Sequence, residues 1–169
     1  RSAKIANYMQ RATEFGLAKV EVKADFKAVM QRVQDVIATI EPHDSVERFT
    51  GLGVECVMGE AHIIDRYTVQ VGDRTISTKN IIIAAGARPF VPPITGLDEV
   101  GYLTSDTVWE VKEQPKRLLV LGGGPIGCEL SQAFAKLGTQ VTIVEMMDQL
   151  MGREDSDVAE HIRSRFESE

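Results

Sequence analysis

A glycine-rich turn between two apolar segments constrains this chain more than any other feature. The four apolar residues 118–121 run directly into a G-x-G-x-x-G motif that opens an amphipathic segment. The turn consists of Gly122, Gly123, Gly124, Pro125, Ile126 and Gly127. In this motif the glycines permit a tight turn, close approach of a dinucleotide pyrophosphate, and close packing of helix on strand. The helix start directs unpaired N–H groups and a partial positive charge at the phosphates.

The residues after the turn complete a strand–helix–strand pattern. Apolar residues recur at helical spacing over 125–137, Gly138 is a natural stop, and residues 141–144 predict a second strand. The strand over 118–121 is predicted to be buried on both faces, as parallel strands usually are. The simpler alternative is a glycine turn that only packs a helix on a sheet.

Glu145 follows the second strand, 21 residues after Gly124. An acid at this position can accept hydrogen bonds from both ribose hydroxyls of an adenosine. It would also repel a 2′-phosphate, and residues 146–148 include no Arg or Lys to hold one. The pattern therefore favours NAD(H) over NADP(H), the alternative being a solvated Glu at a strand end.

Composition excludes several classes of partner. The 169 residues are 43% hydrophobic and carry a net charge of −6, which argues against nucleic acid or an anionic membrane as a partner. No apolar run approaches the ~20 residues of a membrane span. Cys56 and Cys128 are too few and too far apart for a disulfide framework or a metal cluster. We therefore expect no metal site and a cytoplasmic location, and we interpret Cys128 as a buried packing residue rather than an activated thiol.

The remaining pattern predicts helices and short strands in a definite order. Helices are expected over 2–15, 25–40, 45–51 and 105–111, and from 155 onwards. Short strands are expected over 20–22, 54–63, 67–71 and 74–77, the last two joined by a turn at Gly72-Asp73. An all-apolar buried strand is expected over 81–84.

This order of segments resembles the flavin-dependent pyridine nucleotide–disulfide oxidoreductases. The resemblance covers nearly the whole chain and depends on the β-meander, the segment Thr78 to Gly86, and the segment Gly122 to Glu129. The motifs look most like the dihydrolipoamide dehydrogenase and mercuric reductase branch. The implied fold class is α/β, a Rossmann-like FAD/NAD(P)-binding fold that is incomplete, with the β-meander in its FAD part.

The resemblance also implies a domain division. Residues 1–114 would form part of a FAD-binding domain, and residues 115–169 the N-terminal part of a NAD-binding domain. The FAD pyrophosphate turn, the redox-active cysteine pair and the dimerisation domain are expected outside the 169 residues. The parent protein is expected to be a homodimer, and the chain itself is expected to self-associate through exposed sheet edges.

Five residues receive roles from the resemblance. Ala61 would meet the FAD adenine, and Ala85, Gly86 and Ala87 would form the strand end beside FAD. Ala85 stands where Thr is usual, so one hydrogen bond would be lost. Glu129 would be the catalytic-site carboxylate at the flavin–nicotinamide junction, although a Glu in the first helical turn is also favourable for the helix dipole.

The implied function is hydride transfer from NADH to FAD, and onward to a disulfide or related substrate. The substrate class stays open among dihydrolipoamide, a metal ion and another disulfide. One alternative is that this chain alone is a catalytically inert nucleotide-binding or structural fragment that binds neither cofactor. Another is that the parent is a disulfide-free flavin NADH oxidase.

Overall fold

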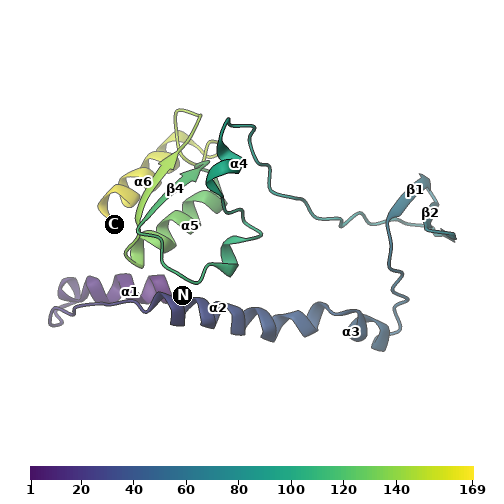
Figure 1. Cartoon of the computed structure of the whole chain (residues 1–169), viewed down its shortest axis with the longest axis horizontal. Coiled ribbons are helices and arrows are strands. Elements are labelled where there is room, and N and C mark those ends of the chain that lie inside the picture. Colours follow the sequence, from purple (N-terminus) through teal and green to yellow (C-terminus); the bar gives the residue numbers. More distant parts are fainter. The chain divides into compact units, whose positions relative to one another are not determined.

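The computed structural model describes all residues from 1 to 169, and these divide into two compact units. Unit 1 contains residues 1–34 and 101–169, and unit 2 contains residues 35–100. The helices are α1 (Ser2–Gln10), α2 (Phe26–Ile40), α3 (Val46–Gly51), α4 (Leu97–Val100), α5 (Pro125–Lys136) and α6 (Ser156–Ser168). The strands are β1 (Ala61–Asp65), β2 (Thr68–Val71), β3 (Arg74–Ser77), β4 (Arg117–Leu121) and β5 (Gln140–Val144) (Figure 1). Short 3₁₀ helices are η1 (Ala12–Phe15), η2 (Glu41–Asp44) and η3 (Val108–Glu110).

The predicted strand–helix–strand pattern is confirmed in unit 1. Strands β4 and β5 pair in parallel, from Arg117 opposite Gln140 to Leu121 opposite Val144. Helix α5 connects them, as a parallel pair requires a crossover. It begins at Pro125, a residue suited to the first helical position, and the chain leaves it through Gly138 at φ +103°.

The core of unit 1 lies where α2 and η3 meet α5. Phe26, Val108 and Phe134 are buried together, and the rings of Phe26 and Phe134 have centroids 5.8 Å apart. Partly buried residues complete this core: Met30, Val111, Leu118, Leu130, Leu137 and Val141. Helix α1 also packs against α5. The sheet and its crossover helix are therefore packed against α1, α2 and η3, which all precede them in the sequence.

The prediction that the strand over 118–121, now β4, is buried on both faces is wrong. In β4, as in β5, exposed and half-buried residues alternate. Leu118 packs in the core, whereas its neighbour Leu119 is 61% exposed. Successive side chains of a strand point to opposite faces, so one face of this sheet is covered by α5 and the other lies open.

Unit 2 contains the predicted β-meander. Strands β1, β2 and β3 form an antiparallel sheet in that order, and Gly72 turns between β2 and β3 at φ +56°. At the turn between β1 and β2, an oxygen of the Asp65 carboxylate accepts a hydrogen bond of 2.7 Å from the Tyr67 N–H. The first strand begins later than expected, at Ala61 instead of residue 54.

Most of the predicted helices are confirmed with adjusted ends. Asp25 caps α2 by accepting a 3.0 Å hydrogen bond from Ala28 N–H, and Ser45 caps α3 with a 3.2 Å bond from Arg48 N–H. The first helix is shorter than predicted, because α1 ends at Gln10 and η1 continues to Phe15. The predicted helix over 105–111 reduces to the single turn of η3.

Two predicted strands do not form. Residues 20–22 and 81–84 have no ladder partner and lie outside every strand. Ile82 is 90% and Ile83 75% exposed, so this segment is not buried. A strand is stable only when its backbone pairs with a neighbouring strand, and neither segment pairs with one in residues 1–169. The domain division expected at residues 114–115 stays a prediction.

Candidate nucleotide-binding turn

The glycine turn has a backbone that only glycine accommodates at two of its positions. Gly122 has φ +106°, and its N–H donates to the carbonyl oxygen of Val144 at 2.8 Å. A side chain at Gly127 would collide with the carbonyl oxygen of Gly122. The strand end, the turn and the helix start are therefore as close together as the motif predicts.

Two N–H groups at the start of α5 have no acceptor in the chain. The first helical hydrogen bond runs from Cys128 N–H to the Gly124 carbonyl at 2.9 Å, and Pro125 has no N–H. The N–H groups of Ile126 and Gly127 are left free, and no atom lies within 4 Å of where a Gly124 side chain would begin. An open approach with free donors and the helix dipole suits an anionic group such as a phosphate.

Glu145 lies beside the turn, as its sequence position predicts. One carboxylate oxygen accepts a 2.6 Å hydrogen bond from Gly123 N–H. The other oxygen accepts hydrogen bonds from the N–H groups of Met146 at 2.6 Å and Met147 at 2.9 Å. Hydrogen bonds from Met147, Gly123 and Met146 lower the pKa of Glu145, against a smaller opposing effect of burial. The carboxylate is therefore ionised at neutral pH.

Cys128 is buried, which confirms its interpretation as a packing residue. Its thiol donates to the carbonyl oxygen of Gly123, with a sulfur–oxygen distance of 3.2 Å. Burial raises the pKa of this thiol, and the negative charge of Glu145 raises it further. Both effects oppose the activation that a helix N-terminus can produce. Cys128 and the half-buried Cys56 are both free.

Glu129 is exposed on α5 and has no hydrogen-bond or ion-pair partner in the chain. Its side chain lines a cleft of about 440 Å³ between α1, α5 and the end of α6. Cationic residues line the same cleft: Arg1, Lys4, Arg11, Lys136 and Arg165. The structure thus places Glu129 in a cleft that Arg1 and Lys4, at the start of α1, also line, and its proposed catalytic role stays a prediction.

Sequence reasoning missed the contacts that close this cleft. The side-chain carboxylate of Glu169 lies 2.7 Å from Lys136 Nζ and 2.8 Å from Arg165 Nε. Gln132 donates to the same carboxylate at 2.7 Å. Lys136 and Glu169 are 33 positions apart, and no periodicity connects α5 with α6, so the sequence carried no signal for this pair.

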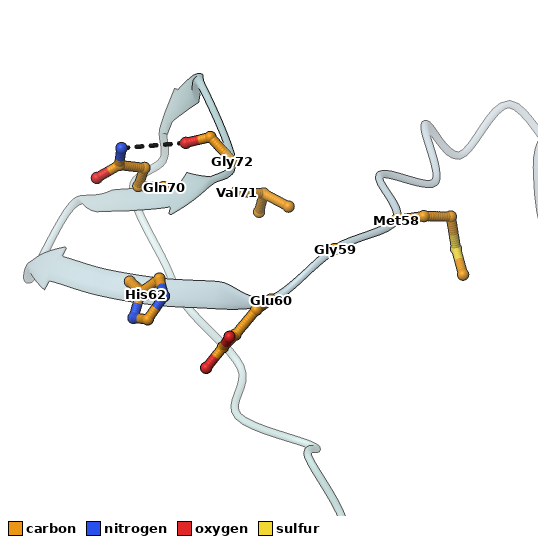
Figure 2. A pocket seen from close by; sticks show the side chains of 7 residues that line it. All are labelled: Met58, Gly59, Glu60, His62, Gln70, Val71 and Gly72. Atoms are coloured by element: carbon orange, nitrogen blue, oxygen red, sulfur yellow. Dashed lines mark hydrogen bonds between the residues drawn. The ribbon is translucent and has the colours of Figure 1, made fainter.

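The expected flavin-side residues lie in unit 2. Ala61 begins β1 opposite Val71, beside a shallow hollow of about 430 Å³. Figure 2 shows the residues that line it: Met58, Gly59, Glu60, His62, Gln70, Val71 and Gly72. Gly59 has φ +144°, and a side chain there would begin 2.8 Å from a methyl group of Val71. The positive φ and the nearby side chain of Val71 thus both favour glycine at this position.

The second flavin-side segment is not brought to that hollow. Ala85, Gly86 and Ala87 are exposed, lie outside regular structure, and do not line the hollow. Gly86 has φ +69°, so a turn is formed there. The nucleotide turn after β4 is therefore assembled in the structure, whereas the residues expected around FAD are not gathered into one site.

The structure contains no other arrangement with evident chemistry. No group of three or more His, Cys, Asp or Glu side chains is placed to hold a metal ion. None of the helices has both the length and the apolar character that crossing a membrane requires.

The fold and the turn together define a Rossmann-like α/β protein, and comparison with known proteins identifies the family. The profile of the family described as "Pyridine nucleotide-disulphide oxidoreductase" matches residues 4–169. The mercuric reductase of Staphylococcus aureus is 35% identical over 162 residues, which are 96% of this chain and 30% of the reductase. The dihydrolipoyl dehydrogenase of Mycoplasma genitalium is 34% identical over 167 residues, covering 96% of this chain and 36% of that enzyme.

A solved structure gives the same result. The Cu(II) complex of the HOCl-induced flavoprotein disulfide reductase RclA from Escherichia coli aligns with a TM-score of 0.71 and 27% sequence identity. The alignment covers 98% of this chain and 35% of that one.

The chain belongs to the pyridine nucleotide–disulphide oxidoreductases, a family of FAD-dependent enzymes that bind a pyridine nucleotide. Its likeness to mercuric reductases and dihydrolipoyl dehydrogenases confirms the branch expected from the motifs. It spans 30% and 36% of the lengths of the two curated relatives named above.

Proposed function

We propose that this chain supplies the NAD(H)-binding turn of an NADH-linked, FAD-dependent disulfide oxidoreductase. The observation that carries the proposal is the assembled turn: free N–H groups at Ile126 and Gly127, an open approach at Gly124, and the ionised Glu145 beside them. These groups suit the two ends of an adenosine diphosphate. The pyrophosphate would lie at the start of α5, and the ribose would lie beside Glu145.

The hydrogen bonds that Glu145 already makes limit how many ribose hydroxyls its carboxylate can accept. A carboxylate offers about four acceptor sites, and Gly123, Met146 and Met147 occupy three of them. One site remains, on the oxygen that faces Gly123. We therefore propose that Glu145 accepts one ribose hydroxyl directly, and that a second hydroxyl contact displaces one of the N–H donors of Met146 or Met147.

Glu145 also supports NAD(H) over NADP(H). Its negative charge lies beside the place proposed for the ribose and would repel a 2′-phosphate. None of the residues 146–148 is a cation, so nothing in that segment offsets the repulsion.

The remaining parts of the proposal extend to the parent enzyme. When bound, nicotinamide and flavin supply the redox chemistry, namely hydride transfer and the passage of electrons to a disulfide or related substrate. Glu129 is the proposed carboxylate at the junction of the two rings, and Ala61 and residues 85–87 are the proposed FAD contacts. The division at residues 114–115, a homodimeric parent and a cytoplasmic location are further parts of the proposal.

A second candidate is a nucleotide-binding chain with no turnover of its own. Its supporting observation is the exposure of the flavin-side segment, where Ile82 and Ile83, close to Ala85, are 90% and 75% exposed. A protein of this kind binds NADH through the α5 turn but does not retain FAD.

A visible spectrum of the purified chain separates the two candidates. Bound flavin that bleaches on addition of NADH supports the flavoenzyme and excludes the inert chain. A colourless chain that binds NADH supports the second candidate. A chain that binds neither nucleotide contradicts both. If the purified chain is colourless but binds NADH, the Glu145→Gln variant tests the site. It is expected to bind NADH about tenfold more weakly and to prefer NADH over NADPH less strongly.

A further inference from the structure

We propose that Met151 is a positioning residue for the nucleotide turn, acting through its backbone. The inference builds on the proposed function, because it concerns the same turn. It assigns a role to the segment 146–152, which follows Glu145 along the chain.

The backbone N–H and carbonyl of Gly123 make three hydrogen bonds with groups outside the turn. Its N–H donates to the Glu145 carboxylate at 2.6 Å. Its carbonyl oxygen accepts from the Cys128 thiol at 3.2 Å and from the Met151 N–H at 2.7 Å. Glu145 immediately precedes the segment 146–152, and Met151 lies near its end. Glu145 and this segment therefore hold the N–H and the carbonyl of Gly123, respectively.

Met151 has an unusual backbone for this task. It is the one non-glycine residue of the chain with a positive φ, at +54°. Such a conformation is uncommon for a residue with a side chain and persists where surrounding contacts impose it. Here the Met151 N–H points to Gly123, and its carbonyl accepts a 2.7 Å hydrogen bond from Glu154 N–H. The left-handed backbone of Met151 therefore directs its N–H to Gly123 and its carbonyl to Glu154.

Side chains of the segment keep it against the turn. A methyl group of Leu150 lies 2.5 Å from where a side chain at Gly123 would begin. The sulfur of Met147 lies equally close, 2.5 Å, to where a side chain at Gly152 would begin. Both glycines thus allow the segment to pack closely, which brings the Met151 N–H within reach of the Gly123 carbonyl.

The orientation of Gly123 affects the proposed phosphate donors. Gly123 precedes Gly124, Pro125 and the free N–H groups of α5 by one to four residues. If the backbone of Gly123 rotates, the backbone of Gly124, which the phosphate is proposed to approach, moves with it. A residue that fixes this peptide before the nucleotide arrives lowers the cost of ordering the turn on binding.

Substitutions that differ only in tolerance of a positive φ test the inference. Met151→Gly keeps the N–H and accepts the left-handed backbone, so its Kd for NADH is expected to stay within about twofold of the parent chain. Met151→Val keeps the N–H but is β-branched and disfavours this backbone, so its Kd is expected to rise about tenfold. Met9→Val on α1 is the matched control, expected to bind as the parent does.

The readouts are NADH fluorescence titration at a temperature well below each melting point, and amide hydrogen exchange. Equal NADH affinity of Met151→Val and the parent chain would overturn the inference. If Met151→Val fails to fold, hydrogen exchange decides. A protected amide at position 151 in both the parent chain and Met151→Gly supports the inference, and a rapidly exchanging one overturns it. A parent chain that does not bind NADH refutes the proposed function, whereas the Met151 amide still reports on the positioning contact.

Discussion

Glu145 shows how one side chain serves both the fold and the proposed site. Its ionised carboxylate accepts three backbone N–H groups, which ties the end of β5 to the glycine turn. Such bonds to a charged acceptor are stronger than those between neutral groups. Because they favour the ionised form, they lower the pKa of Glu145 in the folded chain.

This lowered pKa predicts a pH-dependent contribution of Glu145 to stability. The contribution is present above the unfolded pKa, about 4.3, and is lost as the pH falls through the lower pKa of the folded chain. The parent chain should therefore melt above Glu145→Gln at pH 7, and the gap should narrow below about pH 4. Thermal melts of both proteins from pH 7 to pH 3 measure it. A gap that is the same at both ends of this range would refute the prediction.

At the level of elements, pairing partners explain which predictions succeeded. The β4–α5–β5 unit and the β-meander are confirmed because each consists of neighbours in sequence that pair with one another. Residues 20–22 and 81–84 have strand-like composition but no neighbouring strand, which local pattern does not reveal. The caps at Asp25 and Ser45 were predictable because capping is local.

The same reasoning applies to the candidate site. The glycine turn and Glu145 were predictable, because the motif defines their spacing and the parallel strands bring them together. The contact of Met151 with Gly123 and the pair of Lys136 with Glu169 were not, because both join segments through tertiary packing alone.

The tie between α5 and α6 predicts a measurable stability difference. The side chains of Lys136 and Glu169 are 12% and 8% exposed, and removing the cation leaves a poorly solvated carboxylate. Burial opposes ionisation of Glu169, but the hydrogen bonds and charges of Lys136 and Arg165 together outweigh it and lower its pKa. Lys136→Met is expected to lower the free energy of unfolding by about 1–3 kcal/mol.

The matched control for this tie is an exposed cation on α6. Arg163 pairs with Glu160 and Glu167 at the surface, and Arg163→Met should cost at most about 0.5–1 kcal/mol. Urea unfolding of both variants measures the comparison. Equal losses would show that the α5–α6 pair contributes no more than a surface ion pair.

At the level of the whole molecule, uncovered apolar surface is the dominant feature. Leu119 and Leu121 lie on the open face of the β4–β5 sheet, and Ile82, Ile83 and Phe90 are exposed in unit 2. Unpaired sheet edges and apolar patches of this kind promote association. The structure is therefore consistent with a chain that self-associates, which remains a proposal.

A charge on the open sheet face tests this proposal. Leu119→Lys places a cation on that face without touching the side of the sheet that packs on α5. Sedimentation velocity should show concentration-dependent association of the parent chain and less association of the variant. A parent chain that stays monomeric at high concentration, or a variant that associates equally, would contradict the expectation.

NADH binding by glycine variants tests the central claim most directly. A side chain at Gly127 would meet the Gly122 carbonyl, whereas at Gly51, in α3, it would meet no atom within 4 Å. We predict that the parent chain and Gly51→Ala bind NADH with the same Kd, and that Gly127→Ala binds at least about tenfold more weakly. If Gly127→Ala binds as tightly as the parent, or the parent does not bind, the turn after β4 is not the NAD(H) site.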